Sequence, residues 1–285
     1  MTPEEDLAIA RNAIFSNTFK TTLDAGKIAT SVMARAVTNH TIGQVAANAG
    51  FHAVMVDMEH SVVGLETAAG VFASTLSAGL TPLVRVPPDS GAEWISRSLD
   101  GGALGVIVPH VNTAAEARAA VKYAKFSPLG ERSISGGLPI FGLKNVPQVA
   151  ASQVANENTL VICMIETQKA VDNVDEILAV EGVDMLHVGT NDLADSLGIT
   201  GDLANERIFA MYTRISDAAA RASAKNKNGR KIYIGMGGLQ GRPEVIHRLV
   251  NEDKNKLIRW ISTADFPMYA QALEDCATMM NKMLN

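Results

Sequence analysis

Short apolar segments alternate with longer helix-like segments along nearly the whole sequence. This alternation is typical of successive βα units, in which parallel strands pair side by side and helices cover the outside. Eight segments have the length and apolar content of a buried strand, and eight strands close a parallel barrel. They are residues 28–34, 53–58, 81–86, 104–109, 159–165, 183–189, 231–236 and 256–262.

Between these strands lie segments with the start and stop signals of helices. Several begin at an N-capping residue and end at glycine, such as TIGQVAANAG, GLETAAGVFASTLSAG, SGAEWISRSLDGG and NTAAEARAAVKYAK. A barrel of this type needs about 250 residues, and the chain has 285, of which 47% are hydrophobic. The sequence therefore predicts an α/β fold, a single (β/α)8 TIM barrel over residues 28–285 that follows an N-terminal extension, residues 1–27.

Two segments stand apart from this alternation. Residues 126–147 are rich in Gly, Pro and Ser, and they are long enough to form a functional loop. The last segment, AQALEDCATMMNKMLN, has the pattern of an amphipathic helix with a Met-rich face. We expect this helix to pack against the outside of its own barrel; the alternative is a helix exchanged between the subunits of an oligomer.

Charge and cysteine content exclude several classes of protein. The formal net charge of -5 argues against a nucleic-acid or anionic-membrane surface. The N-terminus is acidic, and no apolar run approaches the ~20 residues of a membrane span. Cys163 and Cys276 lie far apart without a CxxC motif, so neither a disulfide framework nor a zinc site is indicated. We expect a cytoplasmic protein that acts on a small molecule.

Charged and titratable residues follow several of the predicted strands. In parallel barrels the chemistry takes place where strands end and βα loops begin, so these side chains should converge on one mouth. They are Asp57, Glu59, His60, Arg85, His110, Glu166 and Asp192.

Glu166 and Asp192 are separated by one βα unit, so they should end adjacent strands, whose axes are ~4.8 Å apart. Two carboxylates that close repel each other unless a cation lies between them. Hard carboxylate oxygens favour Mg²⁺ or Mn²⁺, which leave coordination positions for water or substrate oxygens. The alternative is a structural role at helix N-termini, because Thr167 and Asp192 each precede a helical stretch.

Arg85 and His60 also have two interpretations each. Arg85 would place a permanent positive charge at the mouth, where it could neutralise an oxyanion. It could equally pair with Asp57 or Glu59, and both roles are compatible. His60 follows a strand, as a proton-transfer group should, although a single histidine in a loop is more often structural.

Six motifs together resemble the HpcH/HpaI aldolase family, the metal-dependent pyruvate aldolases. The resemblance runs from about residue 28 to about residue 270, in the order of the family's motifs. The motifs are DMEH at 57–60, LVR at 83–85, SLDGG at 98–102, SPLGERS at 127–133, MIET at 164–167 and VEGVDMLHVGTNDL at 180–193.

The resemblance implies a barrel of the phosphoenolpyruvate/pyruvate type that binds a 2-oxo acid on a divalent metal. Glu166 and Asp192 match the family's ligands to Mg²⁺ or Mn²⁺. Arg85 matches the arginine that steadies the enolate, His60 matches the histidine that moves protons, and Asp57 belongs to the same catalytic group. Backbone amides of Gly189, Thr190 and Asn191 would hold the substrate carboxylate, and His110 would contact the substrate.

Asp100 matches an aspartate that the family pairs with the histidine. It precedes the fourth strand, so it should lie at the opposite end of its own barrel and reach a mouth only from a neighbouring subunit. The alternative is an acid at a helix C-terminus without a catalytic role. The resemblance thus suggests a homo-oligomer, specifically a hexamer of barrel pairs with exchanged C-terminal helices.

Three departures from the common family pattern bear on the reaction. Met164 replaces a glutamine, Thr190-Asn191 replaces Pro-Ala, and His110 replaces a methionine. The leading hypothesis is an aldolase that cleaves a 4-hydroxy-2-oxo acid to pyruvate and an aldehyde. The second, favoured by His110 and Met164, is an oxaloacetate decarboxylase that resembles macrophomate synthase and passes the enolate to another acceptor. The third is a catalytically silent barrel that serves as a binding module.

Overall fold

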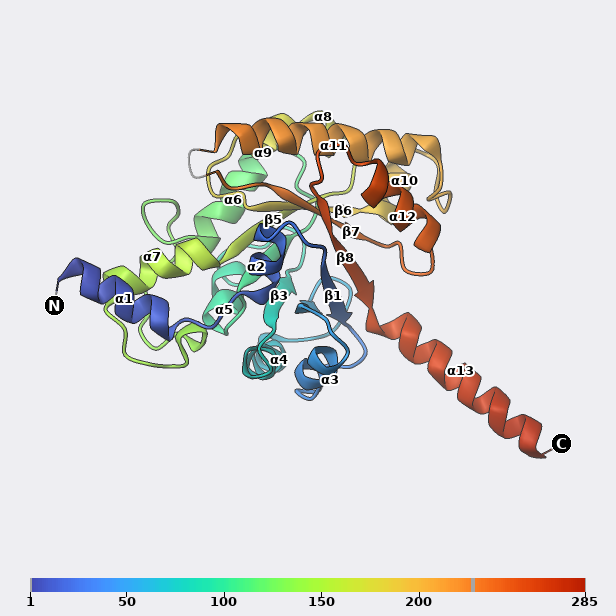
Figure 1. Cartoon of the computed structure of the whole chain (residues 1–285), viewed down its shortest axis with the longest axis horizontal. Helices are drawn as coiled ribbons and strands as arrows, with labels where there is room; N and C mark the ends of the chain where they lie inside the picture. Colours follow the sequence, from blue (N-terminus) through green and yellow to red (C-terminus); the bar gives the residue numbers. More distant parts are fainter. Residues whose placement is uncertain (1, 227–228, 285) are drawn as a thin grey trace.

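The computed structural model, which describes residues 2–226 and 229–284, contains a closed barrel of eight parallel strands (Figure 1). Each strand pairs with the next in the chain, and β1 pairs with β8 to close the barrel. The predicted (β/α)8 fold is therefore confirmed. The strands are β1 (Ala29–Ala34), β2 (Ala53–Asp57), β3 (Thr81–Arg85), β4 (Gly105–Val108), β5 (Leu160–Ile165), β6 (Met185–Gly189), β7 (Tyr233–Gly237) and β8 (Ile258–Ala264).

Helices surround the barrel, and the four predicted helical segments contain α3, α4, α5 and α6. Thr113 and Glu116 form a capping box at the start of α6. The helices are α1 (Pro3–Ala13), α2 (Thr18–Asp24), α3 (Ile42–Asn48), α4 (Leu65–Ser77), α5 (Ile95–Asp100), α6 (Ala114–Ala124), the 3-10 helix η1 (Pro139–Phe141), α7 (Gln148–Asn158), α8 (Gln168–Asp172), α9 (Val174–Leu178), α10 (Thr190–Ser196), α11 (Glu206–Lys225), α12 (Pro243–Glu252) and α13 (Asp265–Leu284).

The strand boundaries differ from the predicted ones by at most two residues, and β8 is shifted by two residues at both ends. The cause is a turn before β8. The carboxylate of Asp253 accepts hydrogen bonds from the backbone N–H groups of Leu257 and Ile258, at 2.6 and 2.8 Å. Lys256 in this turn has a φ of 58°, outside the extended range of a strand. Hydrophobicity alone does not reveal such a turn.

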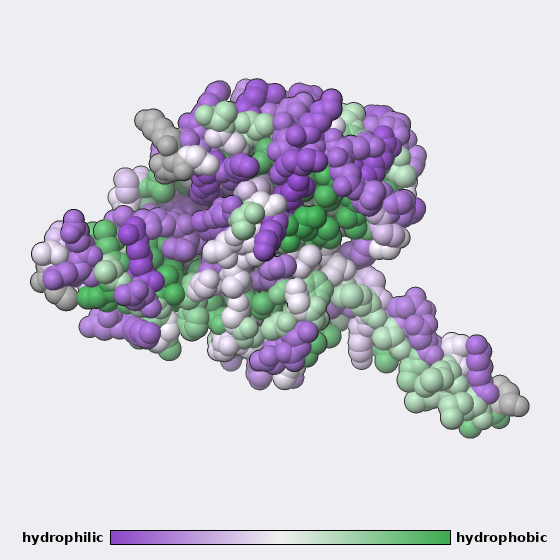
Figure 2. Space-filling model, in the orientation of Figure 1, coloured by the Kyte–Doolittle hydropathy of each residue, from purple (hydrophilic) through white to green (hydrophobic). Residues whose placement is uncertain are grey.

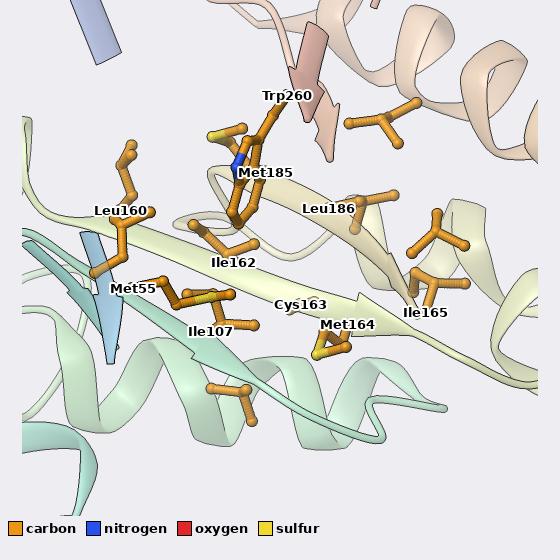
Figure 3. Close-up of a cluster of buried hydrophobic side chains, with 14 of the residues drawn as sticks. Met55, Ile107, Leu160, Ile162, Cys163, Met164, Ile165, Met185, Leu186 and Trp260 are labelled. Atoms are coloured by element: carbon orange, nitrogen blue, oxygen red, sulfur yellow. The ribbon is translucent and has the colours of Figure 1, made fainter. Parts of the chain in front are cut away.

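The inside of the barrel is filled by large apolar side chains (Figure 3). Met55, Ile107, Ile162 and Met185 lie there with Trp260, which is fully buried. Helix α2 closes the amino end of the barrel: its Phe19 meets Trp260 edge-on, with ring centroids 5.1 Å apart. The N-terminal extension therefore contributes Phe19 to the barrel core, and α2 covers the amino end of the barrel.

Residues 126–147 pack at the amino end of the barrel, with α1 and α7. The backbone N–H of Phe15 donates to the carbonyl of Ile140, and the side chain of Asn156 bonds to the backbone of Phe126. Phe126 and Ile140 are buried in a second hydrophobic cluster with residues of α1 and α7. This segment therefore lies away from the mouth of its own barrel.

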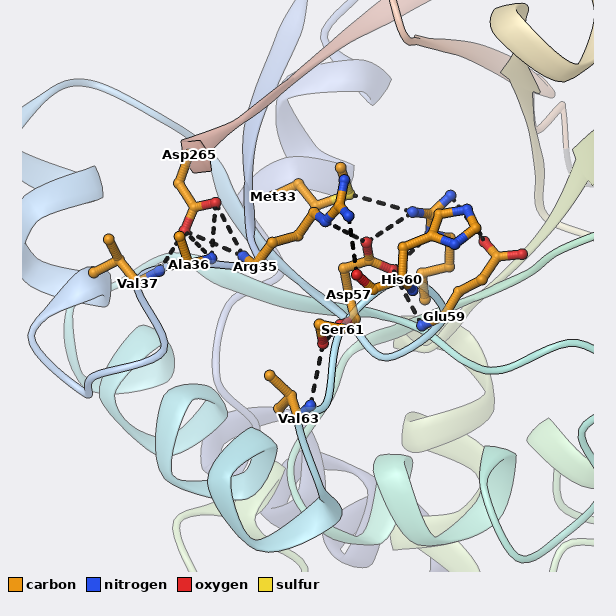
Figure 4. Close-up of polar contacts among 11 residues, drawn as sticks. Met33, Arg35, Ala36, Val37, Asp57, Glu59, His60, Ser61, Val63 and Asp265 are labelled. Carbon is orange, nitrogen blue, oxygen red and sulfur yellow. Dashed lines mark hydrogen bonds and ion pairs between the residues drawn. The ribbon is translucent and has the colours of Figure 1, made fainter. Parts of the chain in front are cut away.

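Helix α13 projects away from the barrel rather than packing against it (Figure 1). The expectation that it covers the outside of its own barrel is wrong. Its first residue, Asp265, is anchored: the carboxylate accepts hydrogen bonds from the backbone N–H groups of Arg35, Ala36 and Val37 (Figure 4). Beyond that anchor the helix is exposed, and apolar residues lie along it (Figure 2). They are Phe266, Met268, Tyr269, Leu273, Met279, Met280, Met283 and Leu284.

None of the helices in the described part of the chain combines the length and the apolar content needed to cross a membrane.

Candidate active site

A cavity of about 290 Å³ opens at the carboxyl ends of the strands. Six of the predicted site residues line it: His60, Arg85, Gly189, Thr190, Asn191 and Asp192. Further residues in or just after the strands complete the lining, namely Met33, Arg35, Met55, Ile107, Met164, His187, Gly237, Gly238, Gln240, Ser262, Thr263 and Ala264.

Arg85 is held by Asp57 from the adjacent strand, in register with it. The Nε and Nη2 groups of Arg85 donate to Oδ1 and Oδ2 of Asp57, at 2.9 and 2.8 Å. Burial would raise the pKa of Asp57, but the hydrogen bonds and the charge of Arg85 outweigh it and lower that pKa. The guanidinium is therefore fixed by a buried carboxylate at the cavity wall.

Glu59 connects Arg85 to two histidines, one of which, His60, lies beside it in Figure 4. Its carboxylate lies 2.9 Å from Nη1 of Arg85 and 3.2 Å from Nε2 of His110. Nε2 of His60 is 3.7 Å away, and the His60 side chain is half-exposed at the mouth. Arg85 thus pairs with Asp57 and with Glu59 while still lining the cavity, so the two roles predicted for it are compatible.

Glu166 follows β5 and is buried, with 1% of the residue exposed. Its Oε2 accepts a hydrogen bond from the backbone N–H of His110 at 2.9 Å, and Nδ1 of the same histidine lies at 3.4 Å. Burial raises the pKa of Glu166, the contacts with His110 oppose this, and the charges of Glu59 and Asp192 raise it further. The net result is a raised pKa, so burial and the like charges disfavour the ionised form of Glu166.

Asp192 lies in the first turn of α10, at the end of β6, the neighbour of β5. It lines the cavity, and the N-cap position of α10 is occupied by Gly189 rather than by Asp192. The hydroxyl of Thr190 is engaged with Tyr212 and with the carbonyl of Gly237, at 2.8 and 2.7 Å. The side chain of Thr190 therefore fixes the turn, while the substrate contact predicted for this turn involves backbone N–H groups.

The two carboxylates have the chemistry of a magnesium or manganese site. Both supply hard oxygen donors, and a cation would relieve the repulsion that Glu59 and Asp192 exert on Glu166. Within residues 2–226 and 229–284, no group of three or more His, Cys, Asp or Glu side chains is arranged to hold a metal. Mg²⁺ is commonly bound through one or two carboxylates.

The structure separates Asp100 from the other predicted site residues. It ends α5, before β4, at the amino end of the barrel, as its place in the sequence predicts. Its Oδ1 accepts hydrogen bonds from Nη2 and Nε of the buried Arg132, at 2.7 and 3.3 Å. The Asp100 side chain remains 40% exposed.

Two titratable residues of the cavity lining, Arg35 and His187, were not predicted from the sequence. The side chain of Arg35, just after β1, donates from Nη2 to the carbonyl of His60 at 2.9 Å. Its Nε lies 3.4 Å from Oδ2 of Asp57. His187 occupies an inward position of β6, two residues before Gly189. A polar residue at an inward position of a predicted barrel strand was the signal that would have identified His187.

Comparison with known proteins identifies the family of this chain. The chain matches the family described as HpcH/HpaI aldolase/citrate lyase over residues 31–227. It is 36% identical to a 4-hydroxy-4-methyl-2-oxoglutarate aldolase of Chaetomium globosum, over 95% of this chain and 97% of the relative. It is 40% identical to an aldolase of the same description from Hapsidospora irregularis, over 92% of this chain and 94% of the relative.

A solved structure that is similar to this chain belongs to the same family. The HpcH/HpaI aldolase of Desulfitobacterium hafniense has a TM-score of 0.80 and 27% identity, covering 93% of this chain and 97% of that one. The resemblance inferred from the motifs is confirmed, and with it the expectation of a carbon–carbon lyase of the aldolase type. The chain belongs to the HpcH/HpaI aldolase/citrate lyase family.

Proposed function

We propose that this chain is a divalent-metal-dependent aldolase that cleaves a 4-hydroxy-2-oxo acid between C3 and C4, with pyruvate as a product. The observation that carries the proposal is the buried carboxylate of Glu166, which follows β5 next to the strand that leads into Asp192, while Asp192 and the Arg85 cation line the cavity. The two fungal relatives favour a substrate with a second carboxylate, 4-hydroxy-4-methyl-2-oxoglutarate. C4 of that acid carries a methyl group, so the second product is also pyruvate. A substrate with hydrogen at C4 would release an aldehyde.

Glu166 and Asp192 would hold the metal, Mg²⁺ or Mn²⁺. The fit rests on their hard oxygen donors and on the like charges that raise the pKa of Glu166. When bound, such an ion supplies Lewis-acid polarisation of the 2-oxo acid. His110 supports this pair, because its backbone N–H holds Glu166 in place. The His110 ring, 46% exposed, is available to a substrate group entering from the mouth.

Arg85 stabilises the charge that develops as the C3–C4 bond breaks. The electron pair of that bond moves into the enolate, and negative charge builds up on the 2-oxo oxygen. Because Asp57 and Glu59 already fix the guanidinium, little reorganisation is needed when this charge appears. The backbone N–H groups of Gly189, Thr190 and Asn191 would bind the substrate carboxylate.

His60 accepts the proton of the 4-hydroxyl group during cleavage. Its ring lines the cavity and lies within 3.7 Å of Glu59, which can orient it and stabilise the charged imidazolium. In the opposite direction, addition of the enolate to a carbonyl, the same histidine returns the proton to the new alkoxide. Asp57 contributes indirectly, since its Oδ1 accepts hydrogen bonds from the backbone N–H groups of Glu59 and His60.

A homo-oligomer would complete this site. The exposed apolar residues of α13 need a partner surface, and a second copy of the chain is the partner we propose. Asp100 would then approach the His60 of a neighbouring subunit. This fits its contacts, because Arg132 fixes Oδ1 while the side chain stays 40% exposed.

The test is pyruvate formation from 4-hydroxy-4-methyl-2-oxoglutarate and, separately, from oxaloacetate, with Mg²⁺, with Mn²⁺ and with a chelator. We expect metal-dependent cleavage of the hydroxy acid and its loss in Glu166→Gln. Glu131→Gln, which changes an exposed glutamate at the amino end, serves as the control. Turnover of oxaloacetate alone would instead indicate a decarboxylase. Absence of both turnover and metal binding would indicate a binding module.

A further inference from the structure

His187 is a buried histidine whose ring nitrogens have no hydrogen-bond partner among the described residues. The residue is 4% exposed, yet it lines the cavity. Its ring packs on Trp260, with centroids 4.4 Å apart. Buried polar groups in folded proteins are nearly always hydrogen-bonded, so an unpaired histidine at a cavity wall points to a ligand.

The neighbouring strand β7 makes room for this ring. A Cβ atom at Gly237 would lie 2.6 Å from Cε1 of His187. A Cβ atom at Gly235 would lie 2.7 Å from Cδ2 of His187 and 2.2 Å from the Trp260 ring. All three distances are shorter than real Cβ contacts, so the imidazole and the indole beside it require glycine at both positions of β7.

The imidazole of His187 is neutral. Burial lowers its pKa to about 3, and the nearby charge of Arg85 contributes in the same direction. A neutral imidazole carries one N–H donor and one acceptor nitrogen. His187 therefore offers a directional hydrogen bond without adding charge to the cavity.

The place of His187 in β6 determines which part of a bound ligand its ring can contact. It pairs in register with Met164 of β5, and it precedes Gly189 by two residues on the same inward face of β6. It thus lies beneath the ends of β5 and β6, from which Glu166 and Asp192 extend. The side chains of Met55, Ile107 and Met164, which line the cavity with it, have no N–H or O–H donor, and Arg85 and Ser262 are among the donors elsewhere in the lining.

We propose that His187 is a specificity-determining residue, whose ring N–H donates a hydrogen bond to an oxygen at the 2-oxo acid end of the bound substrate. The inference rests on the proposed function for the place where the 2-oxo acid binds. An apolar residue at this position would remove the ring N–H from this wall of the cavity, and a buried oxygen that loses one of its donors binds less tightly.

The experiment is calorimetric titration of the whole protein with pyruvate in Mg²⁺, for the wild type and four variants. His187→Phe removes both nitrogens and retains an aromatic ring against Trp260. His187→Asn and His187→Gln restore an amide N–H near the position of Nδ1 or Nε2. His247→Phe, a ring change on the exposed surface of α12, is the control.

We expect His187→Phe to weaken pyruvate binding about tenfold, the loss of one buried hydrogen bond. Its thermal midpoint should stay equal or rise, because an unpaired buried polar group is removed. Asn or Gln should recover most of the affinity, and His247→Phe should match the wild type. If the Phe variant does not fold, His187→Leu is the apolar comparison.

Two results would overturn the inference: wild-type affinity in the apolar variant, or weak binding that neither amide restores. A different result would contradict the proposed aldolase function. A wild type that binds pyruvate through His187 but cleaves no hydroxy acid would defeat the aldolase and leave the His187 site intact.

Discussion

A Cβ atom at Gly189 would lie 2.3 Å from Oε1 of Glu166. Gly189 has a φ of -82°, a value open to any residue, so its backbone conformation does not require glycine. What requires glycine is the close approach of the Glu166 carboxylate to β6. This approach brings the carboxylate of β5 to the strand that leads into Asp192.

Gly189→Ala should therefore disable the metal pair without unfolding the barrel. The added methyl must displace the Glu166 carboxylate, and loss of ligand orientation typically weakens metal binding by about 10–100-fold. Calorimetry with Mn²⁺ and pyruvate formation both report this loss. Gly64→Ala is the control, since a Cβ atom there meets nothing within 4 Å. Undiminished Mn²⁺ affinity in Gly189→Ala would show that Glu166 does not bind the ion.

Glu166→Gln should raise the stability of the metal-free protein while abolishing metal binding. Burial and the charges of Glu59 and Asp192 hold the pKa of Glu166 above its ordinary value in the folded state. The proton on Glu166 therefore favours folding at acidic pH, and this contribution is lost as the pH rises through the raised pKa. In chelator at pH 7, we expect urea midpoints higher for Glu166→Gln than for the wild type. A lower midpoint would mean that the ionised carboxylate is already compensated.

Hydrophobic periodicity predicted the fold well because each strand of a parallel barrel is buried on both faces. Runs such as LVICMI in β5 are apolar throughout, and they stand out against the amphipathic helices between them. All strands of a parallel barrel end on the same side. Topology alone therefore predicts that one mouth brings together Asp57, Arg85, Glu166 and Asp192.

Contacts that depend on side-chain packing and loop conformation could not be predicted from hydrophobic periodicity or strand topology. The burial of Glu59 among Arg85 and His110 depends on loop conformations, including a left-handed φ of 54° at His110. The direction of α13 was predicted wrongly because an amphipathic pattern shows that a helix needs an apolar partner surface, without showing on which molecule that surface lies.

Asp57→Asn should destabilise the fold by about 3 kcal/mol, because it leaves part of the buried Arg85 charge unpaired. Despite its burial, Asp57 has a lowered pKa in the folded state because of Arg85. Its stabilising effect is therefore complete above the ordinary carboxyl pKa and is lost as the pH falls through the lowered value. Urea unfolding from pH 7 to pH 3 should show a shallower acid slope in the variant.

The exposed pair of Asp24 and Lys20 provides the comparison for Asp57. Its atoms are 2.8 Å apart, with the Asp24 side chain 47% exposed. Asp24→Asn should cost only a few tenths of a kcal/mol. Equal costs for the two substitutions would contradict a special role for the buried pair.

The double substitution Leu273→Asp and Met280→Asp should break the proposed oligomer. These residues lie seven positions apart on one face of α13, and each is more than half-exposed. Charges on that face would oppose burial against a second copy, so light scattering should give a lower mass. Thr278→Asp adds charge to the same helix without removing an apolar side chain. An unchanged mass in the double variant would place the interface elsewhere.

Mixing two inactive variants tests whether Asp100 serves a neighbouring barrel. His60→Ala and Asp100→Ala should each lose most activity alone, since one lacks the proton acceptor and the other its partner. In mixed oligomers, an Asp100→Ala barrel beside a His60→Ala subunit has an intact His60 and receives an intact Asp100. Subunits mixed in equal amounts, dissociated and reassembled, should regain activity at about a quarter of the sites.

If Asp100 acted within its own barrel, every site in the mixture would lack one of the two groups, and no activity would return. The structure argues against that arrangement, because Asp100 is tied to Arg132 at the amino end while His60 lines the opposite mouth. Activity in unmixed Asp100→Ala at the wild-type level would remove Asp100 from the catalytic group altogether. Recovery on mixing would establish both the oligomer and the direction in which its subunits face.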